Sequence, residues 1–190
     1  MIRELVVKNR SYRRFHQDVV IELETLKDLV DLARLSASAA NFQPLKYILS
    51  CDSQKNTLIF PHLGWAAYLK DWPGPGEGEK PSAYIIMLRD TEIKSPLPDF
   101  DCGIASQSIL LGASENGLGG CIIYSVQREK LQGALQIPDR YEIRLVIALG
   151  KPKEIVNIDP VGPEGDIKYW RDAEGVHHVP KRALEDIILE

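Results

Sequence analysis

Cysteine is scarce in this 190-residue sequence: Cys51, Cys102 and Cys121 are odd in number, far apart and free of CxxC spacing. The pattern argues against a disulfide framework and against a zinc site, because both need ligands paired at characteristic intervals. We therefore expect the three side chains to be buried as small hydrophobic groups.

The sequence also lacks a long apolar run and an excess of basic residues. No stretch approaches the roughly 20 apolar residues that a membrane helix needs, and the first residues lack the layout of a signal peptide. The 23 Lys and Arg against 27 Asp and Glu give a net charge of −4, which argues against a nucleic-acid surface. With 44% hydrophobic residues, the chain is expected to form one soluble, cytoplasmic domain over residues 1–190.

Three common catalytic signatures are absent. There is no GxGxxG after a predicted strand, no GxxxxGKS/T and no GxSxG. These absences exclude a Rossmann site, a P-loop and a nucleophile elbow. The doublet His177-His178 lacks carboxylates at metal-ligand spacing, so we predict no metal site. The single histidines His16 and His62 are expected to be structural.

Regular structure can be predicted from the hydrophobic pattern. Apolar residues at helical spacing predict helices, and runs of strand formers predict strands. The predicted helices span residues 25–36, 101–117 and 127–136, and the predicted strands span 45–51, 83–89 and 141–149, with a short strand after Gly119 and Gly120. Helix 101–117 is apolar nearly all round, and Ala105, Ser108 and Gly112 leave room for another helix. We expect it to be the core helix and to offer a dimer face.

Two long segments do not follow these patterns. Residues 60–82 combine Trp65 and Trp72 with several prolines and glycines, a composition that predicts a long excursion and a candidate lid. Residues 151–190 are polar and proline-rich until the short apolar segment 183–189. Because this C-terminal arm has little core of its own, we expect it to pack on something else, such as a second subunit.

The strongest local charge lies in the segment Asn9-Arg10-Ser11-Tyr12-Arg13-Arg14-Phe15. Arginine presents a planar fork of donors that matches phosphate, and a nearby hydroxyl or backbone N–H can complete the site. Because the positive charge is local in an acidic chain, it favours a small anionic ligand. The alternative is a basic surface turn with solvated side chains.

Polar and glycine-rich turns supply further candidates. Ser38, Asn41 and Gln43 lie at a helix-to-strand junction and could orient a heterocycle or a polar chain, although an ordinary Asx-type turn has the same composition. The glycine-rich segment 117–120 would let the backbone approach a flat ligand, although such turns are common.

Four segments, in this order and at similar spacing, resemble motifs of the FMN-dependent nitroreductase family: residues 9–15, 38–44, 117–121 and 179–182. The resemblance covers essentially the whole chain. It implies an α+β fold with a central, mostly antiparallel sheet flanked by helices. It also implies a homodimer with an exchanged C-terminal arm and two FMN sites at the dimer interface.

The resemblance assigns roles to the basic segment. Arg10 and Ser11 would contact the phosphate and ribityl end of FMN, and Arg13 would contact the pyrimidine edge of its ring. Arg14 has no ligand and is left to solvent. Many family members have arginine where this chain has Asn9, so one phosphate contact is missing or supplied from elsewhere.

Other contacts that the resemblance implies come from three places. The partner subunit would supply Ser38, Asn41 and Gln43. The strand after Gly120 would offer backbone N–H groups near the reactive nitrogen of the flavin, at Ile123 and Tyr124. Lys181 and Arg182 would form a late basic pair that closes on the phosphate. Arg171 is the alternative to Arg182 as the late phosphate ligand.

Taken as a whole, the resemblance implies a flavin oxidoreductase with a ping-pong mechanism. NADH or NADPH would deliver hydride to FMN and leave, and a nitroaromatic, quinone or similar acceptor would take its place. No acid–base side chain need be essential, because the flavin carries the chemistry. Alternatives stay open: an FMN-binding redox sensor or carrier without nicotinamide turnover, a non-redox enzyme that consumes flavin, and a dimeric module that binds a phosphate ligand.

Overall fold

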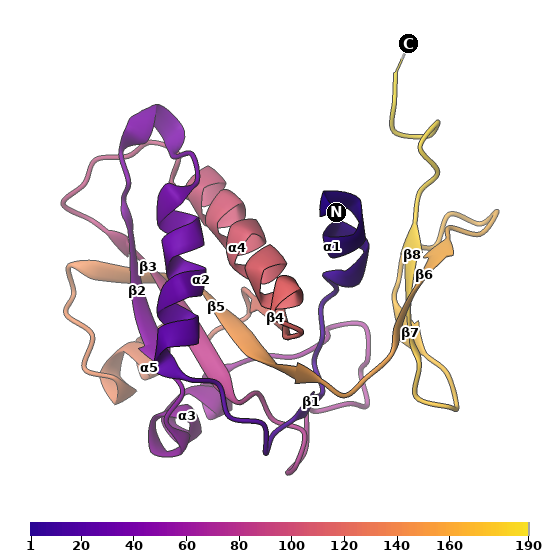
Figure 1. The fold of residues 1–190 in the computed structure, drawn as a ribbon, viewed down its shortest axis with the longest axis horizontal. Coiled ribbons are helices and arrows are strands. Elements are labelled where there is room, and N and C mark those ends of the chain that lie inside the picture. The colour runs from indigo at the N-terminus through magenta and orange to yellow at the C-terminus, as the bar shows by residue number, and fades with distance from the viewer. Residues whose placement is uncertain (190) are drawn as a thin grey trace.

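A five-stranded antiparallel sheet forms the centre of the chain in the computed structural model, which describes residues 1–189 (Figure 1). The strand order is β1-β5-β3-β2, and β4 pairs with β5. The strands are β1 (Phe15–His16), β2 (Leu45–Ser50), β3 (Ala83–Asp90), β4 (Gly119–Ile123) and β5 (Tyr141–Pro152). The predicted α+β fold with a central, mostly antiparallel sheet is confirmed.

Helices cover both faces of this sheet. They are α1 (Ile2–Lys8), α2 (Leu23–Leu35), α3 (Ser53–Ile59), α4 (Pro98–Glu115) and α5 (Arg128–Ala134), with 3-10 turns at Ala39–Asn41 and Phe60–His62. Successive side chains of β3 alternate between two buried layers: Ile85 packs in the layer of α2 and α4, and Ile86 in the layer of α3 and α5. This double coverage explains why β3 is an unbroken apolar run in the sequence.

The small residues of α4 receive a helix of the same chain. A Cβ atom at Gly112 would lie 2.3 Å from Leu32 Cδ1 of α2. Nearby, Ser108 Oγ lies 2.7 Å from Ser36 Oγ. The close helix approach predicted there is therefore made by α2. The exposed apolar residues of α4 lie elsewhere, at Phe100 and Ile104.

After β5, the arm forms a second sheet that the sequence did not predict. Its order is β6-β8-β7, with β6 (Val156–Pro160) parallel and β7 (Trp170–Arg171) antiparallel to β8 (His177–Lys181). In Figure 1 this sheet stands apart from the central one, at the right of the view. The apolar segment that follows exposes Leu184 and Ile187.

Residues 60–82 contain a 3-10 turn and then an irregular path that folds back on itself. The Trp65 ring lies 5.8 Å from the Phe60 ring, and Gly74, with φ +116°, leaves the space in which the Trp65 ring sits. The predicted excursion is thus partly packed. No helix among residues 1–189 is long and apolar enough to cross a membrane. Cys102 and Cys121 are buried as expected, whereas Cys51 is partly exposed.

Candidate functional site

Two glycines of β4 place the basic segment beside the central sheet. Ser11 forms a bridge with Gly120, and the Tyr12 N–H donates to the Gly120 carbonyl at 3.0 Å. A Cβ at Gly119 would lie 2.4 Å from the Tyr12 ring, so only glycine permits this approach. The space that the glycines leave is filled by the chain itself. At Gly117 nothing lies within 4 Å of an added Cβ, and the approach of a flat ligand to segment 117–120 stays a prediction.

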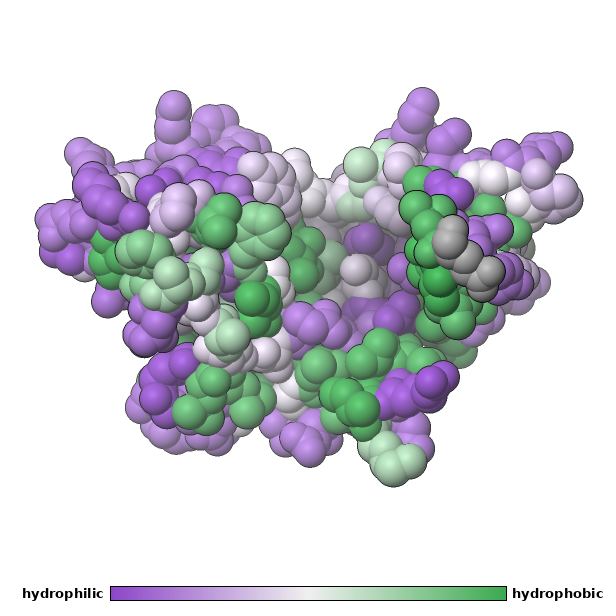
Figure 2. Space-filling view, turned by 90° about the horizontal axis from the view of Figure 1, so that it is seen from above, coloured by the Kyte–Doolittle hydropathy of each residue, from purple (hydrophilic) through white to green (hydrophobic). Residues whose placement is uncertain are grey.

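Most of the basic segment then meets the arm and α4 around one cavity of about 310 Å³. We call this cavity the arginine pocket. The side chains around it come from the basic segment, α4, β4 and the arm: Asn9, Arg10, Ser11, Arg13, Gln107, Leu110, Ile122, Tyr169, His177, Val179 and Lys181. Figure 2 shows the molecule hollowed between its larger body and the smaller part that carries the C-terminal end. Four of the residues predicted for the site line this cavity: Arg10, Ser11, Arg13 and Lys181.

Arg13 is the most constrained of these residues, with 9% of its surface exposed. Its backbone N–H donates to Glu154 Oε1, and its Nη1 lies 3.1 Å from His177 Nε2. The guanidinium also lies 4.7 Å from the centre of the Tyr169 ring, a cation–π contact. The guanidinium of Arg13 is therefore held at the pocket wall before any ligand binds.

Glu154 is a buried carboxylate that no local sequence pattern indicates. It accepts hydrogen bonds from the backbone N–H groups of Arg13 and Arg14 and, at 2.9 Å, from Arg171 Nη2. A buried carboxylate needs such partners because burial otherwise penalises its charge. Arg171 also stacks over the Trp72 ring at 4.8 Å. Arg171 does not line the pocket, so the structure gives no support to it as the rival phosphate ligand.

Of the remaining basic residues, some line the pocket and others pair or lie elsewhere. Arg10 donates from Nη2 to the Val6 carbonyl at 2.6 Å, and its buried Nε has no partner among residues 1–189. Arg14 forms a two-point ion pair with Glu79, at 2.6 and 2.7 Å, so the expectation that it is left to solvent was wrong. The pair exists because residues 60–82 return beside β1. Arg182 is exposed and does not line the pocket.

His177, which the sequence suggested only as a metal-ligand candidate, also lines the arginine pocket. The side chain is 1% exposed. Burial, with the nearby charges of Arg13 and Arg171, lowers the pKa of His177 to about 4. The ring is therefore neutral at pH 7. A neutral imidazole can accept one hydrogen bond and donate another, which suits it to a position beside an arginine.

The next residue, His178, has the opposite environment. Its Nδ1 and Nε2 lie 2.7 Å and 3.1 Å from carboxylates of Asp159 and Asp172. Hydrogen bonds to Asp172 and Asp159 raise the pKa of His178 above its usual value. It binds the strands of the arm together and faces away from the pocket lining.

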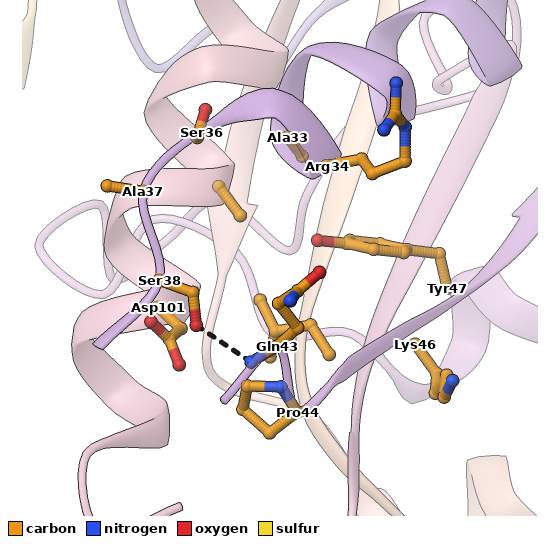
Figure 3. Close-up of a pocket in the computed structure, with 12 residues that line it drawn as sticks. Ala33, Arg34, Ser36, Ala37, Ser38, Gln43, Pro44, Lys46, Tyr47 and Asp101 are labelled. Atoms are coloured by element: carbon orange, nitrogen blue, oxygen red, sulfur yellow. Dashed lines mark hydrogen bonds between the residues drawn. The ribbon is translucent and has the colours of Figure 1, made fainter. Parts of the chain in front are cut away.

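Ser38 and Gln43 lie in a different cavity, of about 200 Å³, which Arg34, Tyr47 and Asp101 also line (Figure 3). Ser38 Oγ accepts from the Gln43 N–H at 2.9 Å. Asn41 and Gln43 have φ of +56° and +51°, the left-handed region, so this segment is a tight, side-chain-supported turn. Asn41 is exposed and lines neither cavity. Within one chain, these residues do not join the arginine pocket.

The side chains of Ile123 and Tyr124 point to the core and to solvent, whereas the flavin contacts expected from their backbone N–H groups stay a prediction. The Ile123 side chain is 3% exposed and belongs to the core layer of α3 and α5. Tyr124 is 67% exposed, with Arg128 over its ring. Ile122 is the strand residue that lines the pocket, because alternate side chains of a strand point to opposite faces.

The donor set of the arginine pocket suits an elongated anion that carries a ring. Arg10, Arg13 and Lys181 supply positive charge, Ser11 a hydroxyl, and Leu110 an apolar wall. The orphaned Arg10 Nε is a donor that a bound anion would satisfy. A larger cavity, of about 450 Å³ near α3, gathers none of the residues predicted for the site.

The chain is similar in sequence to proteins of one family. A family model described as the nitroreductase family matches residues 6–151. A protein of Methanothermobacter thermautotrophicus, provisionally named NADH dehydrogenase/NAD(P)H nitroreductase, is 29% identical over 160 residues, which are 80% of this chain and 78% of that protein. The family match includes the segments 9–15, 38–44 and 117–121 and ends before 179–182.

Solved structures share the fold. The nitroreductase family protein of Streptococcus pneumoniae aligns over 100% of both chains with a TM-score of 0.72 and 16% identity. The FMN-dependent nitroreductase of Clostridium difficile aligns over 80% of this chain and 88% of that chain, with a TM-score of 0.61 and 25% identity.

Proposed function

The chain belongs to the nitroreductase family, and on this premise we propose that it is an FMN-dependent oxidoreductase. It passes hydride from NADH or NADPH to an oxidised acceptor such as a nitroaromatic or a quinone. The observation that carries the proposal is the arginine pocket, in which Arg10, Arg13 and Lys181 surround one cavity. A flavin nucleotide has the matching chemistry, because it joins a phosphate to a ring with hydrogen-bonding edges.

Five residues of the pocket bind the cofactor in this proposal. Arg10, Ser11 and Lys181 bind the phosphate and ribityl end. Arg13 faces the pyrimidine edge of the ring. Asn9 also lines the pocket, so its amide is a neutral donor at the position where many family members have arginine. Lys181 is the member of the late basic pair that meets the phosphate, since Arg182 lies outside the pocket.

Bound FMN would supply the two-electron chemistry, and the protein would position and tune it. The fixed positive charge of Arg13 at the ring edge favours negative charge on the ring, which raises its reduction potential. Ile122 and Leu110 exclude water from the ring on their side of the pocket. No side chain of the pocket is required to act as an acid or base.

The proposal includes a second subunit. Ser38, Asn41 and Gln43 would come from the partner of a homodimer, which is consistent with their position outside the arginine pocket of their own chain. The exposed apolar residues that such a partner would cover lie on α4 and in the C-terminal segment: Phe100, Ile104, Leu184, Ile187 and Ile188. Exchange of the segment after Lys181 between subunits would bury the last three and leave Glu154, Tyr169 and His177 on Arg13 of their own chain.

An absorbance spectrum tests the proposed function directly. Purified protein, reconstituted with FMN where necessary, should show flavin bands that bleach on anaerobic addition of NADH or NADPH and return with a quinone. Colourless protein that cannot be reconstituted would overturn the proposal. Flavin bands that never bleach with either nicotinamide would instead identify a flavin-binding sensor or carrier.

A further inference from the structure

We infer that the C-terminal arm positions Arg13 for the cofactor, and that His177, as a neutral hydrogen-bond acceptor, is the arm residue through which it acts. The inference rests on the proposed function for what Arg13 touches. The clamp itself, formed by Glu154, Tyr169 and His177 around Arg13, is a property of this chain.

All three contacts of the clamp come from residues 151–190, far from Arg13 in sequence. Glu154 fixes the backbone of Arg13, Tyr169 covers one face of its guanidinium, and His177 Nε2 meets its Nη1 at 3.1 Å. The Ser11 carbonyl is a weaker, local contact at 3.4 Å. The direction of the guanidinium therefore depends on the arm more than on the segment that carries the arginine.

The chemistry of this contact fixes the state of His177. Arginine nitrogens only donate hydrogen bonds, so His177 Nε2 must accept and the ring proton must lie on Nδ1. That Nδ1 is buried without a partner among residues 1–189. A doubly protonated ring would point an N–H at the Arg13 guanidinium, with Arg171 also nearby. His177 can thus hold Arg13 only while it is neutral.

Residues 60–82 support the clamp from the other side. The Tyr68 and Tyr169 rings lie 4.8 Å apart, and the Tyr68 N–H donates to the Tyr169 hydroxyl at 3.4 Å. Trp72 lies under Arg171, which in turn binds Glu154. Residues 60–82, for which the lid role stays a prediction, thus support the arm and through it the position of Arg13.

Two variants separate the acceptor from the shape of the ring. His177→Phe keeps an aromatic ring against Tyr169 but removes the acceptor, whereas His177→Gln keeps an acceptor near the position of Nε2. We expect His177→Phe to weaken FMN binding about tenfold and to lower the flavin midpoint potential, because the lost hydrogen bond is to a charged group. His177→Gln should recover the FMN affinity to within about threefold of the wild type and return the midpoint potential toward the wild-type value.

A double-mutant cycle tests whether His177 acts through Arg13. In an Arg13→Ala background, His177→Phe should have no further effect on FMN affinity or potential. If His177→Phe matches the wild type in both quantities, or has its full effect without Arg13, the inference is overturned.

A measurement without flavin keeps this inference separate from the proposed function. Nitrogen-15 NMR of the flavin-free protein at pH 7 should show His177 protonated at Nδ1 and unprotonated at Nε2. Protonation at Nε2 overturns the clamp even if FMN binds. Wild-type protein that binds no FMN overturns the proposed function, and the tautomer then decides the clamp alone.

Discussion

Among the three arginines of the basic segment, contacts rather than charge decide which ones line the arginine pocket. Arg13 lines the arginine pocket, whereas Arg14 is paired with Glu79 outside it. We expect Arg13→Ala to weaken FMN binding about tenfold or more and to lower the flavin midpoint potential. Arg14→Ala is the matched control and should change the FMN affinity by no more than about twofold and leave the midpoint potential unchanged. Equal effects of the two variants in a flavin titration and a redox titration would contradict the assigned roles.

Glu154 is the second residue on which this arrangement depends. Glu154→Ala leaves Arg171 and the N–H of Arg13 buried without their acceptor. We expect it to lower the free energy of unfolding by about 3 to 5 kcal/mol, as for other buried pairs that lose one partner. Glu79→Ala, at a more exposed ion pair, should cost about 1 to 2 kcal/mol. Urea unfolding measures both, and a smaller loss for Glu154→Ala than for Glu79→Ala would refute the comparison.

The adjacent histidines predict opposite pH dependence. The pKa of His177 falls from 6.5 to about 4 on folding. The unfolded chain therefore binds the proton first, and stability is lost as the pH falls below 6.5. The free energy of unfolding of His177→Gln should thus rise by about 2 kcal/mol relative to that of the wild type between pH 7 and pH 5. Equilibrium unfolding at several pH values would measure this slope, and a flat difference would argue against a neutral, buried His177.

The pKa of His178 is raised on folding, so its stabilising effect is complete below the unfolded value and is lost as the pH rises through the folded one. His178→Phe keeps the stack on Trp170 but loses the two carboxylate contacts. Its melting temperature should therefore fall further below that of the wild type at pH 5.5 than at pH 9. A larger loss at pH 9 would contradict this sign.

At the residue scale, the sequence indicates the basic segment but not which of its arginines line the pocket and which pair with carboxylates. Arg10, Ser11 and Arg13 line one cavity, and their role as cofactor ligands stays a prediction. Arg14 and Arg171 could not be sorted in the same way. Their partners, Glu79 and Glu154, lie 65 and 17 residues away, and no local pattern connects them.

At the scale of elements, the glycines of β4 are the point at which the basic segment joins the sheet. A Cβ at Gly120 would lie 2.6 Å from the Ala148 carbonyl oxygen, which belongs to the paired strand and cannot move freely. We expect Gly120→Ala to lower the free energy of unfolding by about 1 to 3 kcal/mol. Gly133→Ala, in α5 with nothing within 4 Å, should raise it by up to about 1 kcal/mol. Thermal or urea unfolding measures both variants, and a Gly120→Ala protein at least as stable as Gly133→Ala would contradict the steric assignment.

Elements with strong periodicity or an unbroken apolar run were predictable. The helix expected at 25–36 is α2, the strand expected at 83–89 is β3, and the core helix expected at 101–117 is α4. The arm was different, because β6, β7 and β8 are short and partly exposed. Their pairing depends on contacts such as the one between His178 and Asp159, which the sequence pattern does not encode.

At the scale of the whole molecule, the two sets of expected site residues lie in separate cavities of one chain. Arg10 and Arg13 face the arm, whereas Ser38 and Gln43 lie between α2, β2 and α4. A complete site that uses both sets therefore requires a second copy. The assignment of Ser38, Asn41 and Gln43 to the partner subunit came from the family resemblance, because the composition of a polar turn does not indicate which chain completes which site.

Complementation between two defective chains tests this arrangement. Arg10→Glu removes a pocket cation, and Asn41→Asp adds a charge without changing the shape of a residue at φ +56°. Each variant alone should bind little FMN. Co-expressed, they should form mixed dimers with one intact site each, so that about a quarter of all sites regain FMN if pairing is random. If each site were built from a single chain, no mixed dimer would contain an intact one. A mixture that stays colourless while light scattering shows mixed dimers would therefore overturn the shared site, and monomeric wild-type protein would overturn the dimer.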